Sequence, residues 1–346
     1  MSKIHNNIPE HLLQQLSQLG YRALKAEDYH IFAPYYDAIN GHYASALSFP
    51  CLLAWSDAIP IFYKPIGGQT EGSLLACLQY DGTIGIWTAL PFIGHYSKEG
   101  VENAFRVLHA DMEALRFPLY VVDMSEWMVP YYQGVGDILW NIKKPREWMD
   151  YIYQRADFEK SLNRSDSLYR RRYFLRKFSP ETVVLTSAHK EECLDCLRAV
   201  WCPGRDCADC FACPVDAVSN VVGALDNLRA DGILVRVDGK PAGFCVVSCR
   251  NGMGCYHFKH ADNRMKGINE YLLSECFTRF LSGAEEINFT EDIGKEGLRA
   301  YKRKLAPYTL SPRMTLRGTV KDNKERIAVF HNGTEKSDRR RMAFRL

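Results

Sequence analysis

Apolar residues recur along the chain at two spacings, one typical of helices and one typical of strands. Residues 8–19 place four leucines on one face, which predicts an amphipathic first helix. Residues 59–68 and 72–94 carry apolar runs broken by Gly, Pro and an Asp-Gly pair, which predicts strands joined by turns. Residues 97–117 return to helical spacing, and residues 118–124 form an apolar run that predicts a buried strand.

The second half of the chain repeats this order of elements. The repetition predicts two similar α/β units, 1–148 and 149–318, each a mixed central sheet flanked by helices, followed by a basic tail over 319–346. The predicted elements of the second unit are a helix over 169–178, a strand over 182–188, helices over 190–201 and 215–229, two or three strands over 232–260, a helix over 268–281, a strand and turn over 287–294, and a short helix over 297–305.

Length and composition agree with a globular protein of two domains. A chain of 346 residues fits two domains of roughly 150 residues each. Apolar residues make up 47% and charged residues 25%, which excludes a disordered or fibrous chain. No run approaches about 18 apolar residues, and the N-terminus lacks the layout of a signal peptide, so we expect a cytoplasmic protein without a transmembrane segment. The net charge of +3 is too small to indicate nucleic-acid binding by itself.

Six of the twelve cysteines lie between Cys193 and Cys213. Four of these six lie in a loop that also contains Pro and Gly, and four thiolates form the closed tetrahedral site of structural zinc. The spacing therefore predicts a structural zinc site, with an iron–sulfur cluster as the less favoured metal group and free thiols as the alternative without metal. The predicted ligands are Cys202, Cys207, Cys210 and Cys213.

A strand, a short basic turn and a helix follow one another over residues 255–273. Backbone N–H groups at such a helix start suit a phosphate or pyrophosphate, which makes Arg264, Lys266, Gly267 and Asn269 candidate donor-binding residues. The turn resembles the R/Q-x-x-G-x-G/A acyl-CoA loop of GCN5-related N-acyltransferases, with Asn269 where that loop has Gly or Ala. The alternative is an ordinary helix that begins after a glycine.

Several segments occur together in an arrangement that resembles a known family. They include the runs at 150–162 and 167–178 and the run from Glu291 to Lys302, which reads E-D-x-G-x-x-G-L-R-x-x-K. Over about residues 25–315 the chain resembles the lysylphosphatidylglycerol-synthetase (phosphatidylglycerol lysyltransferase) C-terminal-domain family. The resemblance implies two tandem GCN5-related acyltransferase (GNAT) folds, a degenerate first unit and a second unit that carries the site. It also implies transfer of an aminoacyl group from aminoacyl-tRNA.

The same resemblance gives roles to a basic segment and to several titratable residues. Arg and Lys alternate with aromatic residues over 169–178, and Arg171 and Arg172 are candidates for contacts to the phosphates of tRNA or coenzyme A; the alternative is a solvated helix face. Acyl transfer to an amine needs a group that takes its proton, for which Glu291, Asp292 and His257 are the candidates. Asp292 alternatively caps the following turn, and a strand histidine alternatively has a structural role.

The sequence thus predicts an acyl- or aminoacyltransferase whose donor is aminoacyl-tRNA or an acyl-CoA. Family members that modify lipids carry a membrane domain ahead of this region, and none is visible here, so a small amine or a peptide is at least as well suited an acceptor as a lipid headgroup. Two alternatives stay open: an acyl-CoA-dependent N-acetyltransferase, and a non-catalytic binding protein whose cysteines respond to metal or redox state. The sequence does not predict the oligomeric state.

Overall fold

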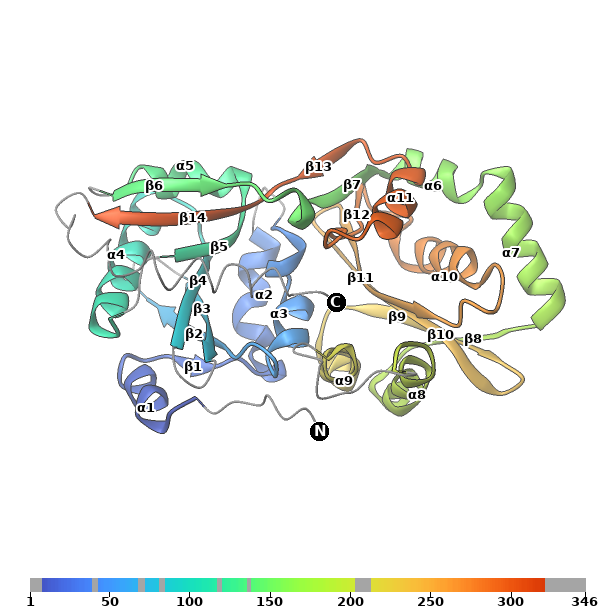
Figure 1. The fold of residues 1–346 in the computed structure, drawn as a ribbon, viewed down its shortest axis with the longest axis horizontal. Coiled ribbons are helices and arrows are strands. Elements are labelled where there is room, and N and C mark those ends of the chain that lie inside the picture. Colours follow the sequence, from blue (N-terminus) through green and yellow to red (C-terminus); the bar gives the residue numbers. More distant parts are fainter. Residues whose placement is uncertain are drawn as a thin grey trace.

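Two seven-stranded sheets lie side by side and are flanked by helices (Figure 1). The structure is a computed structural model that describes residues 8–38, 43–67, 72–80, 85–116, 120–135, 138–202 and 213–320. The predicted architecture of two mixed sheets with flanking helices is confirmed, because each sheet contains one parallel strand pair among antiparallel ones.

The first sheet is built mainly from the first half of the chain. Its strands, in spatial order, are β1 (Arg22–Ala23), β2 (Ile61–Ile66), β3 (Gly72–Tyr80), β4 (Gly85–Gly94), β5 (Tyr120–Ser125), β14 (Arg313–Val320) and β6 (Ile138–Lys143). Its helices are α1 (Glu10–Gln18), α2 (Tyr29–Ala38), α3 (Phe49–Trp55), α4 (Lys98–Ala114) and α5 (Val129–Gln133). The Ser97 hydroxyl accepts a hydrogen bond from the N–H of Gly100 and so caps the N-terminus of α4.

The second sheet contains the remaining strands. In spatial order they are β13 (Thr309–Ser311), β7 (Asp150–Gln154), β12 (Glu286–Asn288), β11 (Met253–Ala261), β10 (Lys240–Arg250), β9 (Asp231–Val237) and β8 (Glu181–Val184). The helices are α6 (Arg155–Leu162), α7 (Ser165–Phe178), α8 (Lys190–Trp201), α9 (Pro214–Gly223), α10 (Ile268–Cys276) and α11 (Glu296–Lys304).

The last strand, β14, crosses from the second half of the chain into the first sheet. It lies between β5 and β6 and pairs antiparallel with both of them. The predicted second unit covers residues 149–318, whereas residues from Arg313 onward are an internal strand of the first sheet. The sequence pattern does not show which sheet this segment joins, because sheet membership depends on pairing partners far away in sequence.

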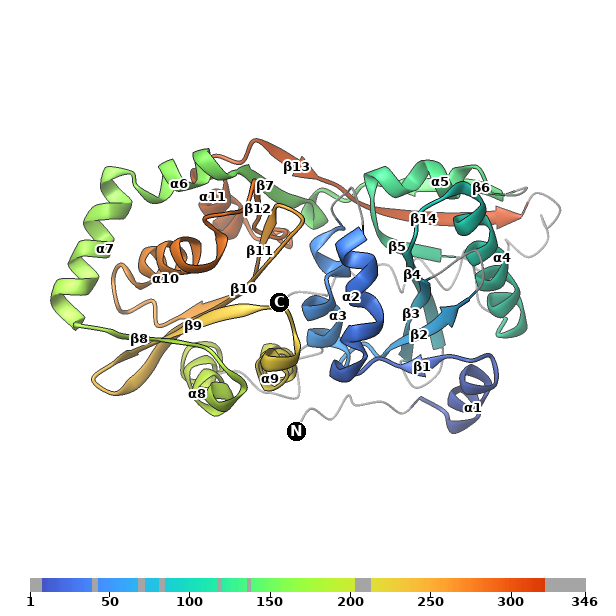
Figure 2. The same cartoon turned by 180° about the vertical axis from the view of Figure 1, so that it is seen from behind.

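One apolar cluster spans both units, and the second unit has a further cluster of its own. Figures 1 and 2 show α2 and α3 between the sheets, and α3 packs against α9 of the second unit. Leu52 and Leu53 of α3 are buried in the same apolar cluster as Val218 and Val221 of α9. This burial removes a continuous apolar surface from water, so it favours one fixed arrangement of the two halves.

Each sheet opens at its parallel strand pair. In the second sheet, β11 and β12 pair from Met253 and Glu286 as far as Cys255 and Asn288, and β11 then continues alone on that edge. In the first sheet, β4 and β5 pair only at Ala89 and Val121 among the described residues. Strands that diverge in this way leave a wedge-shaped opening in the sheet.

In the first unit, aromatic side chains fill this opening. The Phe92 N–H on β4 donates a hydrogen bond of 2.8 Å to the Tyr132 hydroxyl, and the Tyr96 hydroxyl donates to the Phe92 carbonyl at 2.7 Å. Tyr96 also packs edge-on against Trp127, with ring centroids 4.7 Å apart. The first unit therefore uses this opening for core packing.

Candidate functional site

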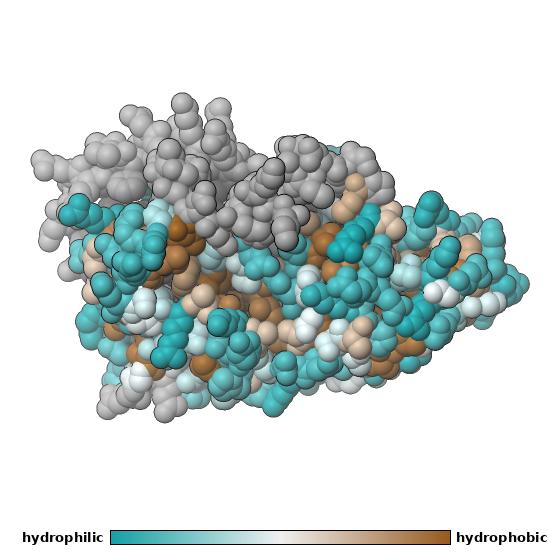
Figure 3. All heavy atoms as spheres, turned by 90° about the horizontal axis from the view of Figure 1, so that it is seen from below, coloured by the Kyte–Doolittle hydropathy of each residue, from teal (hydrophilic) through white to brown (hydrophobic). Residues whose placement is uncertain are grey.

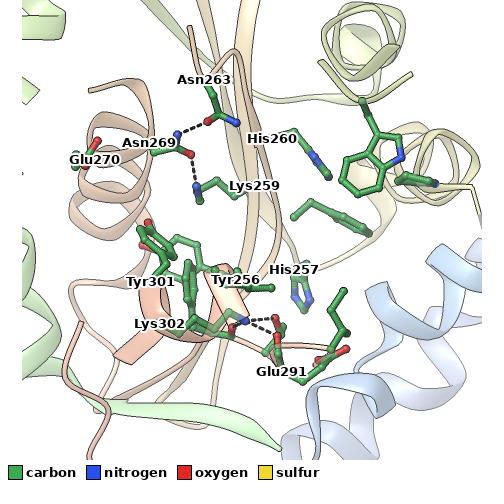
Figure 4. A pocket seen from close by; sticks show the side chains of 18 of the residues that line it. Tyr256, His257, Lys259, His260, Asn263, Asn269, Glu270, Glu291, Tyr301 and Lys302 are labelled. Atoms are coloured by element: carbon green, nitrogen blue, oxygen red, sulfur yellow. Dashed lines mark hydrogen bonds between the residues drawn. The ribbon is translucent and has the colours of Figure 1, made fainter. Parts of the chain in front are cut away.

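A cavity of about 810 Å³ occupies the corresponding opening of the second unit (Figure 4). Its walls come from β11, the segment 289–293 after β12, the N-terminus of α10, and α11. The first unit contributes Ser45, Cys51 and Trp55 from α3 and the turn before it. A volume of this size accommodates an organic ligand of several hundred daltons, and both halves of the chain line it.

A β-bulge on β11 faces this cavity. Val246 pairs with Phe258 and Val247 pairs with Tyr256, which leaves His257 as an extra residue on β11. A bulge interrupts the ladder of backbone hydrogen bonds and is common beside active sites. In the first unit, β4 also has an irregular register next to Phe92, the residue whose N–H binds Tyr132. The second unit has the cavity where the first has that tyrosine.

His257 lines the cavity as a neutral imidazole. Its Nε2 lies 2.7 Å from the Ser248 hydroxyl, and its Nδ1 lies 3.7 Å from the Cys255 sulfur. Burial lowers the pKa of His257 to about 4, so the ring carries no charge at neutral pH. The predicted base therefore lies in the cavity, but with a low proton affinity and with both nitrogens facing polar neighbours.

Glu291 also lines the cavity, directly after the point where the two strands diverge. Its carboxylate lies 2.9 Å from the Arg313 guanidinium, which comes from β14. The same guanidinium lies 2.9 Å from Asp123 of β5 and 5.5 Å from the ring centre of Trp148. Arg313, on the strand β14 that pairs in the first sheet, thus holds the Glu291 carboxylate in place.

Asp292, the next residue, has different surroundings. Its side chain is fully buried and does not line the cavity; it accepts hydrogen bonds from Arg146, Tyr151, Arg299 and the Gly294 N–H at 2.7 to 3.2 Å. Burial alone would raise the pKa of Asp292, but the hydrogen bonds from Arg299 and Tyr151 lower it to about 2. The alternative role as a turn cap therefore describes the geometry of Asp292.

Lys302 of α11 fixes the loop that carries Glu291. Its ammonium group donates hydrogen bonds to the carbonyl of Phe289, to the carbonyl of Glu291 at 2.6 Å and to the Thr290 hydroxyl at 3.2 Å. Burial lowers the pKa of Lys302 to about 8, although Glu291 and Asp150 oppose the shift. The last residue of the E-D-x-G-x-x-G-L-R-x-x-K run thus orders the first.

The turn before α10 differs from an open anion-binding loop. Arg264 is 84% exposed and its guanidinium is bound bidentately by Asp262, at 2.8 and 2.7 Å. Gly267 has a φ of +96°, and a Cβ there would lie 2.1 Å from the Arg170 carbonyl of α7. The glycine therefore permits the close approach of α7, and the arginine is engaged within its own turn.

Lys266 and Asn269 do line the cavity at this end. The Lys266 ammonium lies 5.5 Å from the ring centres of both Tyr169 and Tyr173 on α7. The Asn269 amide donates to the Asn263 side chain at 2.7 Å, so the larger residue that replaces Gly or Ala is held over the helix start. An amide side chain therefore lies at this helix start, where the acyl-CoA loop has Gly or Ala.

The two predicted arginines of α7 have different positions. Arg171 donates a hydrogen bond to the Ser274 hydroxyl of α10, whereas Arg172 is exposed on the outer surface of α7. Neither residue lines the cavity, but Arg170 does, paired with Glu270 at 3.2 Å. The helix therefore presents one arginine to the cavity rim and others to solvent or to α10.

A profile of the family "Phosphatidylglycerol lysyltransferase, C-terminal" matches residues 38–317. The chain belongs to this family. No curated protein is significantly similar to the chain.

Several solved structures share this fold. A conserved protein of unknown function from Bacteroides thetaiotaomicron has 18% identity and a TM-score of 0.72, over 86% of this chain and 99% of that chain. The C-terminal domain of a putative lysylphosphatidylglycerol synthetase from Agrobacterium fabrum has 15% identity and a TM-score of 0.55, over 84% and 92%. L-PGS from Bacillus licheniformis has 14% identity and a TM-score of 0.54, over 92% and 94%.

Family and fold confirm two tandem GNAT-like units and support an enzyme of the acyl- and aminoacyltransferase class. Among the described residues, no helix has the length and apolarity needed to cross a bilayer. Among the coloured residues on the face seen in Figure 3, hydrophilic side chains predominate and apolar ones lie between them.

The cysteine prediction falls partly outside the described residues, which exclude Cys207 and Cys210. Cys202 and Cys213 border that segment and are half-buried, and Cys193 and Cys196 are buried in α8; none of the four forms a disulfide with another described residue. In the described part of the chain, no three metal-binding side chains form a cluster. The zinc site therefore stays a prediction.

Several residues of this site were not among the predicted ones. Lys259 of β11 and Tyr301 and Lys302 of α11 line the cavity, and so does Trp201 at the end of α8. The only signal in the sequence was the position of Lys302 at the end of the most specific family run. Lys259 gave no signal, because a lone lysine in a strand is usually exposed.

Proposed function

We propose that this protein transfers an aminoacyl group from an aminoacyl-tRNA to an amine or hydroxyl group of a small molecule, peptide or lipid headgroup. The observation that carries the proposal is the cavity where β11 and β12 diverge, which joins a β-bulge at His257 to the carboxylate of Glu291. Acyl transfer needs these two elements: donors for a developing oxyanion, and a group that receives a proton.

In the proposed reaction, the ester carbonyl of the donor lies at the bulge, where a backbone N–H is available to stabilise the oxyanion. The acceptor attacks the carbonyl carbon, a C–N or C–O bond forms, and the bond to the ribose oxygen of the tRNA breaks. Glu291 takes the proton that the acceptor loses, and the departing ribose oxygen receives it. Arg313 and Lys302 hold Glu291 and its loop in position.

The surroundings of the donor favour tRNA over coenzyme A. Asp262 engages Arg264, and the Asn269 side chain covers the start of α10, so the turn is poorly suited to a pyrophosphate. Arg170 of α7 lines the cavity and Arg172 is exposed on the outer surface of the same helix, and separated basic residues of this kind suit the spaced phosphates of a nucleic acid.

The test measures transfer from charged tRNA. Purified protein is incubated with total tRNA carrying labelled amino acids and with a panel of acceptors: polyamines, short peptides and phosphatidylglycerol vesicles. We expect label to move from tRNA to one acceptor class, and we expect Glu291→Gln to lower the rate by about 100-fold because the proton acceptor is lost. Glu285→Gln, an exposed carboxylate outside the cavity lining, is the matched control and should retain activity.

Other outcomes identify the alternatives. Transfer from acetyl-CoA but not from charged tRNA would identify the protein as a coenzyme A-dependent N-acetyltransferase and reject this proposal. Absence of transfer from either donor, together with metal bound to the purified protein, would favour the non-catalytic binding protein.

A further inference from the structure

Three lysines line the side of the cavity formed by β11, α10 and α11: Lys259, Lys266 and Lys302. None of them has a carboxylate within 4.0 Å in the described part of the chain, whereas Arg170 and Glu291 of the same cavity are both paired. The charge of Lys302 is met by three oxygen atoms of the loop 289–291, and Lys266 lies exposed at the rim. Of the two lysines that lie deeper in the cavity, Lys259 has one hydrogen-bond partner and Lys302 has three.

Lys259 lies inside the cavity, on the strand that carries the bulge (Figure 4). Its ammonium group donates a hydrogen bond to the Asn269 side-chain oxygen and lies 5.4 Å from the centre of the Tyr301 ring. Asn269 is held in turn by Asn263, so the lysine has a fixed direction. An amide and an aromatic face only partly compensate a buried positive charge, whereas an anion would compensate it fully.

The position of Lys259 identifies the part of a ligand that it meets. It is two residues beyond His257, which at about 3.3 Å per strand residue places it about 7 Å along β11 from the bulge. It therefore lies between the bulge and the rim lysine, Lys266. In an aminoacyl nucleotide, a phosphate follows the ester carbonyl at a spacing of the same order, namely the span of one ribose.

We propose that Lys259 binds the phosphate of the donor nearest to the acyl ester, with Lys266 contacting the donor further out at the rim. This inference rests on the proposed transferase function and assigns to β11 the phosphate contact that the sequence suggested for Arg264. It also gives Asn269 a purpose, since its side chain directs the Lys259 ammonium into the cavity.

The experiment measures binding of two probes: an RNA minihelix ending in CCA, by filter binding, and inorganic pyrophosphate, by calorimetry. We expect Lys259→Met to weaken RNA binding about tenfold, the effect of losing one charge-assisted hydrogen bond. The slope of log affinity against log salt should fall by about one. Lys259→Arg should restore most of the affinity, and Lys240→Met, at the exposed first residue of β10, should change neither quantity.

The two probes separate failure of this inference from failure of the proposed function. If RNA binds equally well to wild type and to a folded Lys259→Met variant, Lys259 is not a phosphate ligand, and the tRNA proposal survives. If pyrophosphate binds in a Lys259-dependent manner and RNA does not bind, the phosphate site stands and the tRNA donor is rejected. If neither probe binds to wild type, the inference is overturned.

Discussion

The adjacent carboxylates Glu291 and Asp292 have different surroundings, and this difference determines which of them a ligand in the cavity can reach. Glu291 faces the cavity and meets one arginine at its edge, whereas Asp292 is buried among Arg146, Tyr151 and Arg299. The sequence presents them as equal candidates for proton transfer. Because Glu291 faces the cavity, it can contact a ligand there. Asp292 contacts only residues that hold the turn together.

The pKa of Asp292 makes a prediction about stability at acid pH. Its folded-state pKa of about 2 lies below the ordinary value of 3.8, so its contribution is complete above about pH 4 and is lost as the pH falls from about 4 towards 2. The shift corresponds to about 2 kcal/mol of unfolding free energy. Urea unfolding at pH 7 and pH 3 should show a steeper loss for wild type than for Asp292→Asn. Equal pH dependence in the two proteins would contradict this role.

The hydroxyl of Tyr132 makes a second prediction at this scale. It accepts the Phe92 N–H in the aromatic cluster that fills the first unit, so Tyr132→Phe leaves a buried donor without an acceptor. We expect the unfolding free energy to fall by about 1–3 kcal/mol. Tyr131→Phe, one residue earlier and only half-buried, is the control and should cost less. Thermal or urea unfolding of both variants decides the point.

At the scale of elements, α7 can pack closely against the start of α10 because the residue at the contact is a glycine, Gly267. A Cβ at Gly267 would meet the Arg170 carbonyl at 2.1 Å, and its φ of +96° disfavours any L-residue. Gly267→Ala should therefore displace α7 and lower the unfolding free energy by at least about 2 kcal/mol. Gly239→Ala, at a φ of +72° with open space around it, carries the backbone strain without the clash. If the two variants are equally destabilised, the packing of α7 does not depend on this contact.

Most elements could be predicted from the sequence, because helices and strands follow from local periodicity. The helices at 97–117, 190–201 and 268–281 and the strands of 232–260 all lie where the pattern placed them. The bulge at His257 could not be predicted, since it depends on the register between two strands. The ion pair between Arg264 and Asp262 could not be predicted either, because a motif shows residue types and not their partners.

At the scale of the whole molecule, the site belongs to both units. Cys51 and Trp55 of α3 line the cavity, and the arginine that contacts Glu291 sits on the exchanged strand β14. The first unit therefore forms one wall of the cavity, and the arginine of β14 orients the carboxylate of Glu291. A resemblance to tandem folds predicted two copies, but the sharing of one cavity required the positions of residues more than 200 apart in sequence.

The exchanged strand also constrains the order in which the chain acquires its structure during synthesis. Strands β5 and β6 do not pair with each other, because β14 separates them, and β14 is made last. When the first 150 residues have left the ribosome, their sheet still lacks an internal strand and exposes two unpaired edges. The amino-terminal half must wait for the carboxy-terminal half, so the two units mature as a single cooperative unit rather than one after the other.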